Sequence, residues 1–437
     1  MRIAQELRSL SPMALRLVAM KFLAYVGMQG AYFVGILGTL TYALGGDPTS
    51  ASATVGLLNL MFLLGSFKSG SLLDAMGPRR HFHMVVASTA LACVLVFLLS
   101  DSVLGILVGT SVFGLAWGLA DPLLRSYPAY LTSDEGELKT VNAVMCTAVS
   151  VGVVVGPLVG SAVSLAAPPS ATLLFAGAMA LLALVPARGF LPERGGRGGC
   201  ALAGGAGSGD VGEQGGSGSE DEQVGPVSAP DEAEHGGMRE SLAGFRLVFG
   251  TPTLALIFVA DFLAFFGYGA FDALESLYYR DALEVGVTWM GVLSGVSGVG
   301  GILGGIALMR LPARRVNLRS LLLVLALLGL ARLVYVGTSL VVVALVSQTL
   351  VGVAFGAFNP LQGTLVQADA PIESVGRVSS VMSLGFTVAG VVPLFLAPAF
   401  AEVAGVQGTL VGASACVLVA PLAMLAVLPR IEGRGRR

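Results

Sequence analysis

Three acidic and two aromatic residues share one face of a long apolar segment in the second half of the chain. Asp261, Phe265, Tyr268, Asp272 and Glu275 recur at helical spacing, which places them on one side of a helix. A carboxyl group inside an apolar span is desolvated, and such a group can exchange protons near neutral pH. Aromatic rings beside carboxylates suit an amphiphilic or cationic ligand. We therefore predict that Asp261 couples to protons and that Phe265 and Tyr268 contact a ligand.

Alternatives stay open for these charged positions. Asp261 also fits a structural ion pair with a basic residue. Asp272 and Glu275 lie toward the end of the segment, and we interpret them as residues that reach the outer membrane interface. Arg332 is the only basic residue well inside a span of the second half. We expect its side chain to extend toward the outer surface, and substrate contact is the alternative.

The first apolar segment also carries polar residues at helical spacing. Tyr25 and Gln29 are further candidates for the pathway, whereas Lys21 is close enough to the cytoplasmic edge to extend toward it. Polar residues inside other spans are expected to form interhelical hydrogen bonds more often than ligand contacts. These are Asn59, Gln348 and Asn359.

The composition requires lipid around most of the chain. Hydrophobic residues make up 55% of the 437 positions and charged residues 12%, whereas a soluble domain carries about 25% charge. A span needs about 20 apolar residues. Twelve candidates meet this requirement, at 17–43, 52–73, 83–100, 104–124, 141–165, 171–189, 251–276, 288–309, 318–336, 340–362, 378–400 and 408–428. The basic N-terminal residues lead into a full-length span, so we expect a retained helix rather than a signal peptide.

One polar segment separates the first six spans from the last six. Residues 195–237 hold 15 Gly and eight acidic residues among 43, a composition too poor in apolar groups to order itself. We interpret this segment as a tether rather than a regulatory element. The predicted organisation is an N-terminal six-helix lobe at 1–190, a flexible cytoplasmic linker at 191–245 and a C-terminal six-helix lobe at 246–437.

The basic residues predict the orientation. If the N-terminus is cytoplasmic, 21 of the 25 Lys and Arg residues fall in cytoplasmic segments and only Arg280 falls in an opposite loop. The remaining three lie within spans. This asymmetry predicts a multi-pass protein of the cell membrane with both termini in the cytoplasm.

A short basic turn occurs twice, at 70–80 and 305–315, each time after the second span of its half. Two related halves are typical of a two-lobed transporter. Gly70 permits close helix approach and Gly77 a tight turn, while Asp74 needs a partner at the membrane edge. The residues assigned to this gating motif are Gly70, Leu72, Asp74, Gly77, Arg79 and Arg80, with Arg314 and Arg315 in the second copy.

A second motif lies in the fifth span. Gly152, Gly156, Pro157 and Gly160 form the pattern G-x-x-x-G-P-x-x-G. Small residues four positions apart allow tight helix packing, and the proline removes a backbone donor. Generic packing and a more specific exporter motif are both compatible with this pattern.

The turn at 70–80 resembles the signature G-x-L-x-D-x-x-G-x-R-R of the major facilitator superfamily. The resemblance implies an all-α membrane protein with twelve transmembrane helices in two pseudo-symmetric six-helix lobes. It also implies that Asp74 lies near 376–380 and that Arg79 or Arg80 lies near an acid of the fourth helix. Asp121 is a candidate for that acid, although a local pair with Arg125 explains it equally well.

The fifth-span pattern resembles the motif of proton-coupled drug exporters in this superfamily. Those exporters usually carry an arginine on the fourth helix, four residues before a glycine, where this chain has Thr110 before Gly114. Residues 242–246, 142–143 and 371–378 are similar to the branch that contains enterobactin exporters and macrolide-efflux proteins. The resemblance covers nearly the whole chain outside the 195–237 segment.

These observations predict proton-driven export of a small amphiphilic molecule, such as a drug, an antibiotic or a siderophore, by alternating access. An importer of a nutrient and a non-transporting scaffold or sensor are the alternatives. No Walker-type phosphate loop, paired cysteines or convergent nucleophile and base are visible, and His81, His83 and His235 form no metal set. We expect a small-molecule substrate, protons and the lipid bilayer as partners, and no cofactor, metal, nucleic acid or enzymatic activity.

Overall fold

The computed structural model describes residues 11–126, 135–187, 244–370 and 374–434. Within these ranges every regular element is a helix. The first half contains α2 (Pro12–Gly30), η1 (Ala31–Ala43), α3 (Pro48–Met76), α4 (Pro78–Leu98), α5 (Val103–Ser126), α6 (Glu135–Val163), α7 (Ala171–Leu182) and α8 (Leu184–Ala187). The second half contains α10 (Pro252–Asp281), α11 (Thr288–Met309), η3 (Ala313–Arg315), α12 (Leu318–Val336), α13 (Val341–Asp369) and α14 (Val375–Arg434).

The described helices confirm the twelve predicted spans. Ten are long and apolar enough to cross a membrane, and the apolar helix at 171–187 is shorter. The last of the ten contains Gly405, whose backbone leaves helical geometry at φ 73° and so divides α14 into two arms. Most of the predicted linker at 191–245 lies outside the described residues, so its bounds stay a prediction. Residues 244–250 are helical.

The first span combines two kinds of helix. Its first half, α2, is α-helical, and its second half, η1, is a π-helix of 13 residues. π-Helical segments are rare and are frequent at functional sites. Tyr32 lies in the first turn of η1 and, as shown below, contacts the other lobe.

Local sequence explains how the helices begin and end. Asp47 caps α3 by accepting a hydrogen bond of 2.8 Å from the backbone N–H of Ser50. The hydroxyl and the N–H of Ser50 together hold the pKa of Asp47 below its ordinary value. At the other end of α3, Gly77 adopts φ 77° and ψ 161°, a conformation open essentially to glycine alone. Pro78 then begins α4 at once.

The two copies of the basic turn fold differently. The second copy has Pro312 in place of Gly77, and the chain passes through the 3₁₀ turn η3 before Asn317 caps α12. The close helix approach predicted for Gly70 is wrong in this conformation, because a Cβ atom at Gly70 would meet no heavy atom within 4 Å. Gly70 is exposed, and it lies at the end of the molecule where the lobes are apart.

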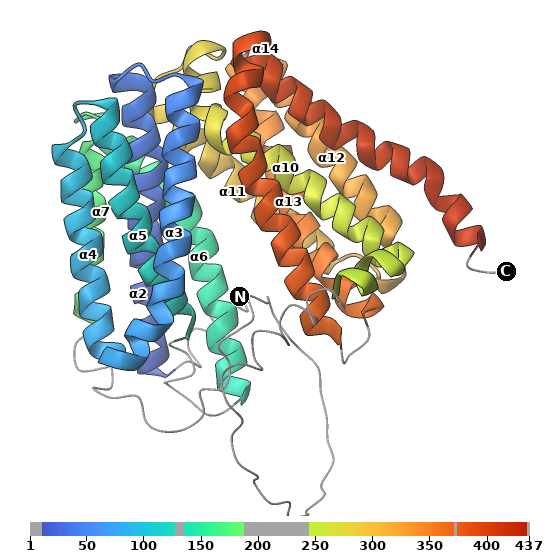
Figure 1. Cartoon of the computed structure of the whole chain (residues 1–437), viewed down its shortest axis with the longest axis horizontal. Helices are drawn as coiled ribbons and strands as arrows, with labels where there is room; N and C mark the ends of the chain where they lie inside the picture. Colours follow the sequence, from blue (N-terminus) through green and yellow to red (C-terminus); the bar gives the residue numbers. More distant parts are fainter. Residues whose placement is uncertain (1–10, 127–134, 188–243, 371–373, 435–437) are drawn as a thin grey trace, which may run out of the picture.

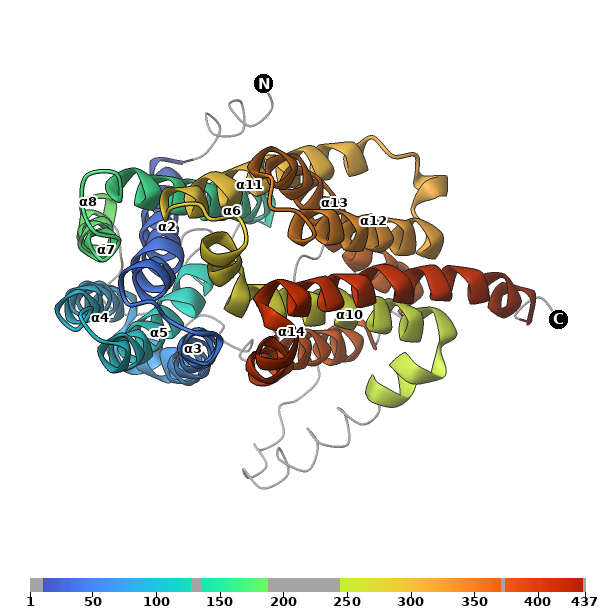
Figure 2. The same cartoon turned by 90° about the horizontal axis from the view of Figure 1, so that it is seen from above.

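The helices form two lobes that touch at one end (Figures 1 and 2). We call this the closed end; it carries the connections at 44–47 and 282–287. In Figure 1 the ribbons of the two lobes diverge toward the opposite end. One core cluster joins residues of η1, α3 and α5 with residues of α10, α11 and α14, whereas a second cluster lies within the C-terminal half. The lobes therefore share an apolar core at the closed end.

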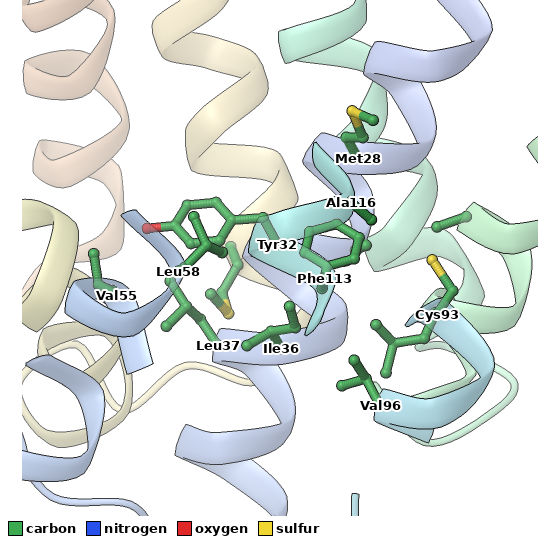
Figure 3. Close-up of a cluster of buried hydrophobic side chains, with 14 of the residues drawn as sticks. Met28, Tyr32, Ile36, Leu37, Val55, Leu58, Cys93, Val96, Phe113 and Ala116 are labelled. Atoms are coloured by element: carbon green, nitrogen blue, oxygen red, sulfur yellow. The ribbon is translucent and has the colours of Figure 1, made fainter. Parts of the chain in front are cut away.

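The core of the first lobe contains side chains from α2, η1, α3, α4 and α5. Met28 and Ile36 meet Val55, Cys93 and Phe113 there (Figure 3). Large apolar side chains also cover the outside of the protein, as Phe67 at 75% exposed and Phe395 at 76% exposed illustrate. Because lipid is as apolar as these side chains, the helices associate through close packing and hydrogen bonds rather than through exclusion of water.

Candidate transport pathway

The acidic face of α10 points toward the other lobe at the closed end. The hydroxyl of Tyr32 donates a hydrogen bond of 2.6 Å to Oδ1 of Asp272, and the hydroxyl of Thr41 donates one of 2.9 Å to Oγ of Ser276. Nη1 of Arg280 donates to the carbonyl oxygens of Thr41 and Gly46, each at 2.9 Å. η1 and α10 are thus joined across the lobe boundary by side chains of both.

Glu275 is bound within the second lobe. Its Oε1 accepts a hydrogen bond of 2.9 Å from the hydroxyl of Tyr335 on α12 and one of 3.2 Å from Nε2 of Gln348 on α13. Asp272 and Glu275 are only half-buried by exposed area, yet both have side-chain donors. The interpretation that they reach the outer interface stays a prediction, and hydrogen bonds between helices hold both carboxylates in this structure.

Arg332 does not extend to the outer surface. It is 4% exposed, and its guanidinium carbon lies 4.7 Å from the ring centre of Phe271 and 5.7 Å from that of Tyr268. Its Nη1 has no hydrogen-bond partner among the described residues. The expected extension toward water is wrong because the rings of α10 accept the charge through cation–π contact.

Asp261 is the carboxyl group on this face of α10 for which the described residues provide no partner. It is 6% exposed, and no hydrogen bond or ion pair reaches it from the part of the chain that the structure describes. The structural ion pair that was the alternative for this residue is thus absent from the described residues. A desolvated carboxylate without a counter-ion is costly in a membrane. Binding of a proton or a cation to Asp261 would remove that cost.

Aromatic rings from three helices lie next along the same face. The ring centre of Phe265 lies 4.0 Å from that of Phe386 on α14 and 5.8 Å from that of Phe355 on α13. Tyr268 stacks on Phe355 at 6.1 Å and is 40% exposed. Helical spacing predicts Phe265 and Tyr268 on this face, whereas Phe355 and Phe386 have no local signal, because only the fold brings α13 and α14 beside α10.

The candidates in the first span lie elsewhere. Tyr25 is buried and Gln29 half-buried, and Cβ atoms built at Gly152 and Gly156 of α6 would come within 3.0 Å and 2.9 Å of their Cβ atoms. Both residues thus pack against α6. Lys21 is 7% exposed and interacts with other groups, so the expected extension of Lys21 to the membrane edge is wrong.

The fifth-span motif packs α6 on two sides. Gly152, Gly156 and Gly160 allow close contact with α2, η1 and α7. On the side of the other lobe, Oγ of Ser161 accepts a hydrogen bond of 2.9 Å from the N–H of Gly291 on α11. A Cβ at Gly291 would collide with the carbonyl oxygen of Pro157. The motif therefore lies at a contact between the lobes.

The gating motif lies at the end away from the closed end. Its four arginines, Arg79, Arg80, Arg314 and Arg315, are exposed. The side chains of Asp74, Asp121 and Arg125 lie outside the described residues, so their predicted contacts stay predictions. Thr110, where related exporters carry arginine, is fully buried and its hydroxyl has no described partner.

Comparisons with known proteins agree with this architecture. The profile of the Major Facilitator Superfamily matches residues 17–393. The multidrug efflux pump Tap of Mycolicibacterium fortuitum is 29% identical over 195 residues, which are 43% of this chain and 46% of the pump. The match thus spans less than half of the pump's length.

Two solved structures illustrate the shared fold. The nucleoside transporter NupG superposes with a TM-score of 0.68 at 11% identity, over 95% of this chain and 99% of NupG. A bacterial homologue of the iron transporter ferroportin, in an inward-facing state, gives 0.69 at 16% identity, over 94% of this chain and 97% of the homologue. At these identities the likeness shows the fold alone.

Proposed function

Because the chain belongs to the Major Facilitator Superfamily and is a membrane transport protein rather than an enzyme, we propose that it exports a small amphiphilic molecule by proton antiport. The partial similarity to a multidrug efflux pump supports the direction. The single observation that carries the proposal is Asp261, a buried carboxyl group without a described partner on a face lined by aromatic rings.

The distribution of basic residues supports an orientation for this structure. Because 21 of the 25 Lys and Arg residues fall in segments predicted to be cytoplasmic, the closed end, which carries Arg280, faces the outside of the cell. The lobes then meet outside and diverge toward the cytoplasm, which is the conformation that receives a substrate from the cell interior. In this orientation both termini and the predicted linker at 191–245 are cytoplasmic, and the linker tethers the lobes.

Transport then requires the closed end to open. The hydrogen bonds of Tyr32, Thr41 and Arg280 across the lobe boundary break, and the lobes rock about the site between them. A proton entering from outside neutralises Asp261 and releases the substrate that had bound there. In the opposite state the gating motif around Asp74, Arg79 and Arg80 closes the cytoplasmic end.

The proposal is tested by substrate accumulation in cells that express the protein. Fluorescent dyes and antibiotics are offered with and without a protonophore. We expect lower accumulation in expressing cells, and we expect the difference to disappear when the proton gradient collapses. Asp261→Asn abolishes the difference, whereas Asp101→Asn, an exposed acid at the closed end, preserves it. Higher accumulation in expressing cells indicates import and overturns the proposal.

A further inference from the structure

Carboxyl groups outnumber cationic groups in the membrane-spanning part of the second lobe. Away from the ends of the described spans of this lobe, Asp261, Asp272 and Glu275 lie on one face of α10 and a single guanidinium, Arg332, lies on α12, whereas Arg280 and Asp281 at the end of α10 pair with each other. Asp272 and Glu275 receive hydrogen bonds, and Arg332 lies within electrostatic range of Glu275. Of the three, only Asp261 lacks every such interaction among the described residues. Its negative charge is therefore the one that no described cation or hydrogen-bond donor balances.

The rings beside Asp261 form a wall with an exposed side. Phe265 lies one helical turn from Asp261 and is 8% exposed, whereas Tyr268 and Phe386 are 40% and 45% exposed. The next polar residue on this face, Asp272, contacts the other lobe. The exposed ring surface therefore faces the region between the lobes. A ring presents negative charge density on its face, which attracts a cation.

α10 carries a second aromatic row that makes a useful contrast. Phe258, Phe262 and Phe266 stack in sequence, with ring centres 6.4 Å and 6.0 Å apart, and Phe249 continues the row. Asp261 follows Phe258 by three positions, but no acidic residue of α10 lies three or four positions from Phe262 or Phe266. Phe262 and Phe266 therefore have the aromatic content of the first row without the helical spacing to Asp261.

We propose that the substrate is a lipophilic organic monocation, held in the second lobe with Asp261 as its counter-ion and Phe265, Phe355 and Phe386 as its aromatic contacts. This inference rests on the proposed function only in placing the site on the transport pathway. One unpartnered carboxylate balances one charge. Arg332 occupies the rings of Phe271 and Tyr268 farther along the helix, so it repels a second positive charge and confines the ligand to the Asp261 side.

Lys21 and Arg332 are the cationic groups buried in the described spans. Neither forms a described ion pair with Asp261. Lys21 belongs to the first lobe. Arg332 contacts the rings of Tyr268 and Phe271 farther along α10 than Asp261, at helical rises of about 10 Å and 15 Å from it. The attraction of Asp261 for an external cation is therefore not cancelled by a residue in contact with it.

The test measures binding of tetraphenylphosphonium to the full-length protein in detergent, by equilibrium dialysis at pH 7.5 against protein-free micelles. We expect saturable binding that is lost in Asp261→Asn and kept in Asp261→Glu, which retains the charge. Phe386→Leu weakens binding about five- to thirty-fold, the effect of losing one partly desolvated cation–π contact. Phe266→Leu, in the other aromatic row, leaves it unchanged. Each variant is first shown to be monodisperse.

Charge selectivity provides the second arm. The cation 1-methyl-4-phenylpyridinium displaces tetraphenylphosphonium, whereas its neutral parent 4-phenylpyridine does not. No binding by the wild type, unchanged binding by Asp261→Asn, or equal displacement by the neutral compound overturns the inference. Because binding is measured without a gradient, a protein that binds the cation but does not export it refutes the proposed export and leaves the cation site standing.

Discussion

The hydroxyl of Tyr32 should help to keep the outer side of the transporter closed. Its hydrogen bond of 2.6 Å to Asp272 joins the lobes, and Tyr32→Phe removes that bond while leaving the ring in the core. A hydrogen bond to a carboxylate contributes about 1.5–3 kcal/mol in soluble proteins, and side-chain hydrogen bonds in membrane proteins average about 0.6 kcal/mol. We therefore expect a loss of about 1–2 kcal/mol, or a roughly five- to thirty-fold larger population of the outward-open state.

Labelling from outside measures that population. Ser276 is 4% exposed at the lobe boundary, and Ser276→Cys is placed in a chain whose native cysteines are replaced. A membrane-impermeant maleimide reaches this thiol only when the closed end opens. Tyr32→Phe should raise the labelling rate roughly five- to thirty-fold, in proportion to the outward-open population. Tyr335→Phe is the control, because it also removes a hydroxyl bonded to a carboxylate, but within one lobe. Equal rates in the wild type and Tyr32→Phe refute the reasoning.

Three other substitutions test the fold. Gly77→Ala places a side chain at φ 77° and should destabilise the protein by about 1–3 kcal/mol, measured by thermal unfolding in detergent, whereas Gly70→Ala, with no neighbour within 4 Å, should not. Gly291→Ala should abolish export because its Cβ collides with α6, and Gly286→Ala, in open space, should retain activity. The pKa of Asp47 is lower in the folded protein than in the unfolded chain. Its contribution to stability is therefore present above the unfolded pKa and is lost as the pH falls through the folded pKa. If the unfolding of Asp47→Asn depends on acid in the same way as that of the wild type, this reasoning is contradicted.

The sequence was sufficient for the architecture because membrane spans are long and continuously apolar. The spans predicted at 288–309 and 318–336 coincide with α11 and α12. Gly405 ends one arm of α14 inside the predicted gap between 400 and 408. Helical spacing also predicted that the acids and rings of α10 share a face, since periodicity depends on one helix alone.

The interactions of that face required the fold. Tyr32 and Asp272 are 240 residues apart, and no local pattern indicates that they meet. Arg332 was expected to extend toward water because an isolated helix offers no other partner for its charge, and the rings of Phe271 and Tyr268 come from a neighbouring helix. The π-helical geometry of η1 likewise has no signal among those considered in the sequence.

The most direct test of the central claim is proton movement in reconstituted liposomes. The purified protein is placed in vesicles with an acidic interior and a fluorescent pH indicator, and tetraphenylphosphonium is added outside. The account predicts that the cation accelerates alkalinisation of the interior through the wild type and the Asp101→Asn control, and that Asp261→Asn shows only the passive leak. Cation-stimulated proton release that is unchanged in Asp261→Asn contradicts the assignment of coupling to this carboxyl group.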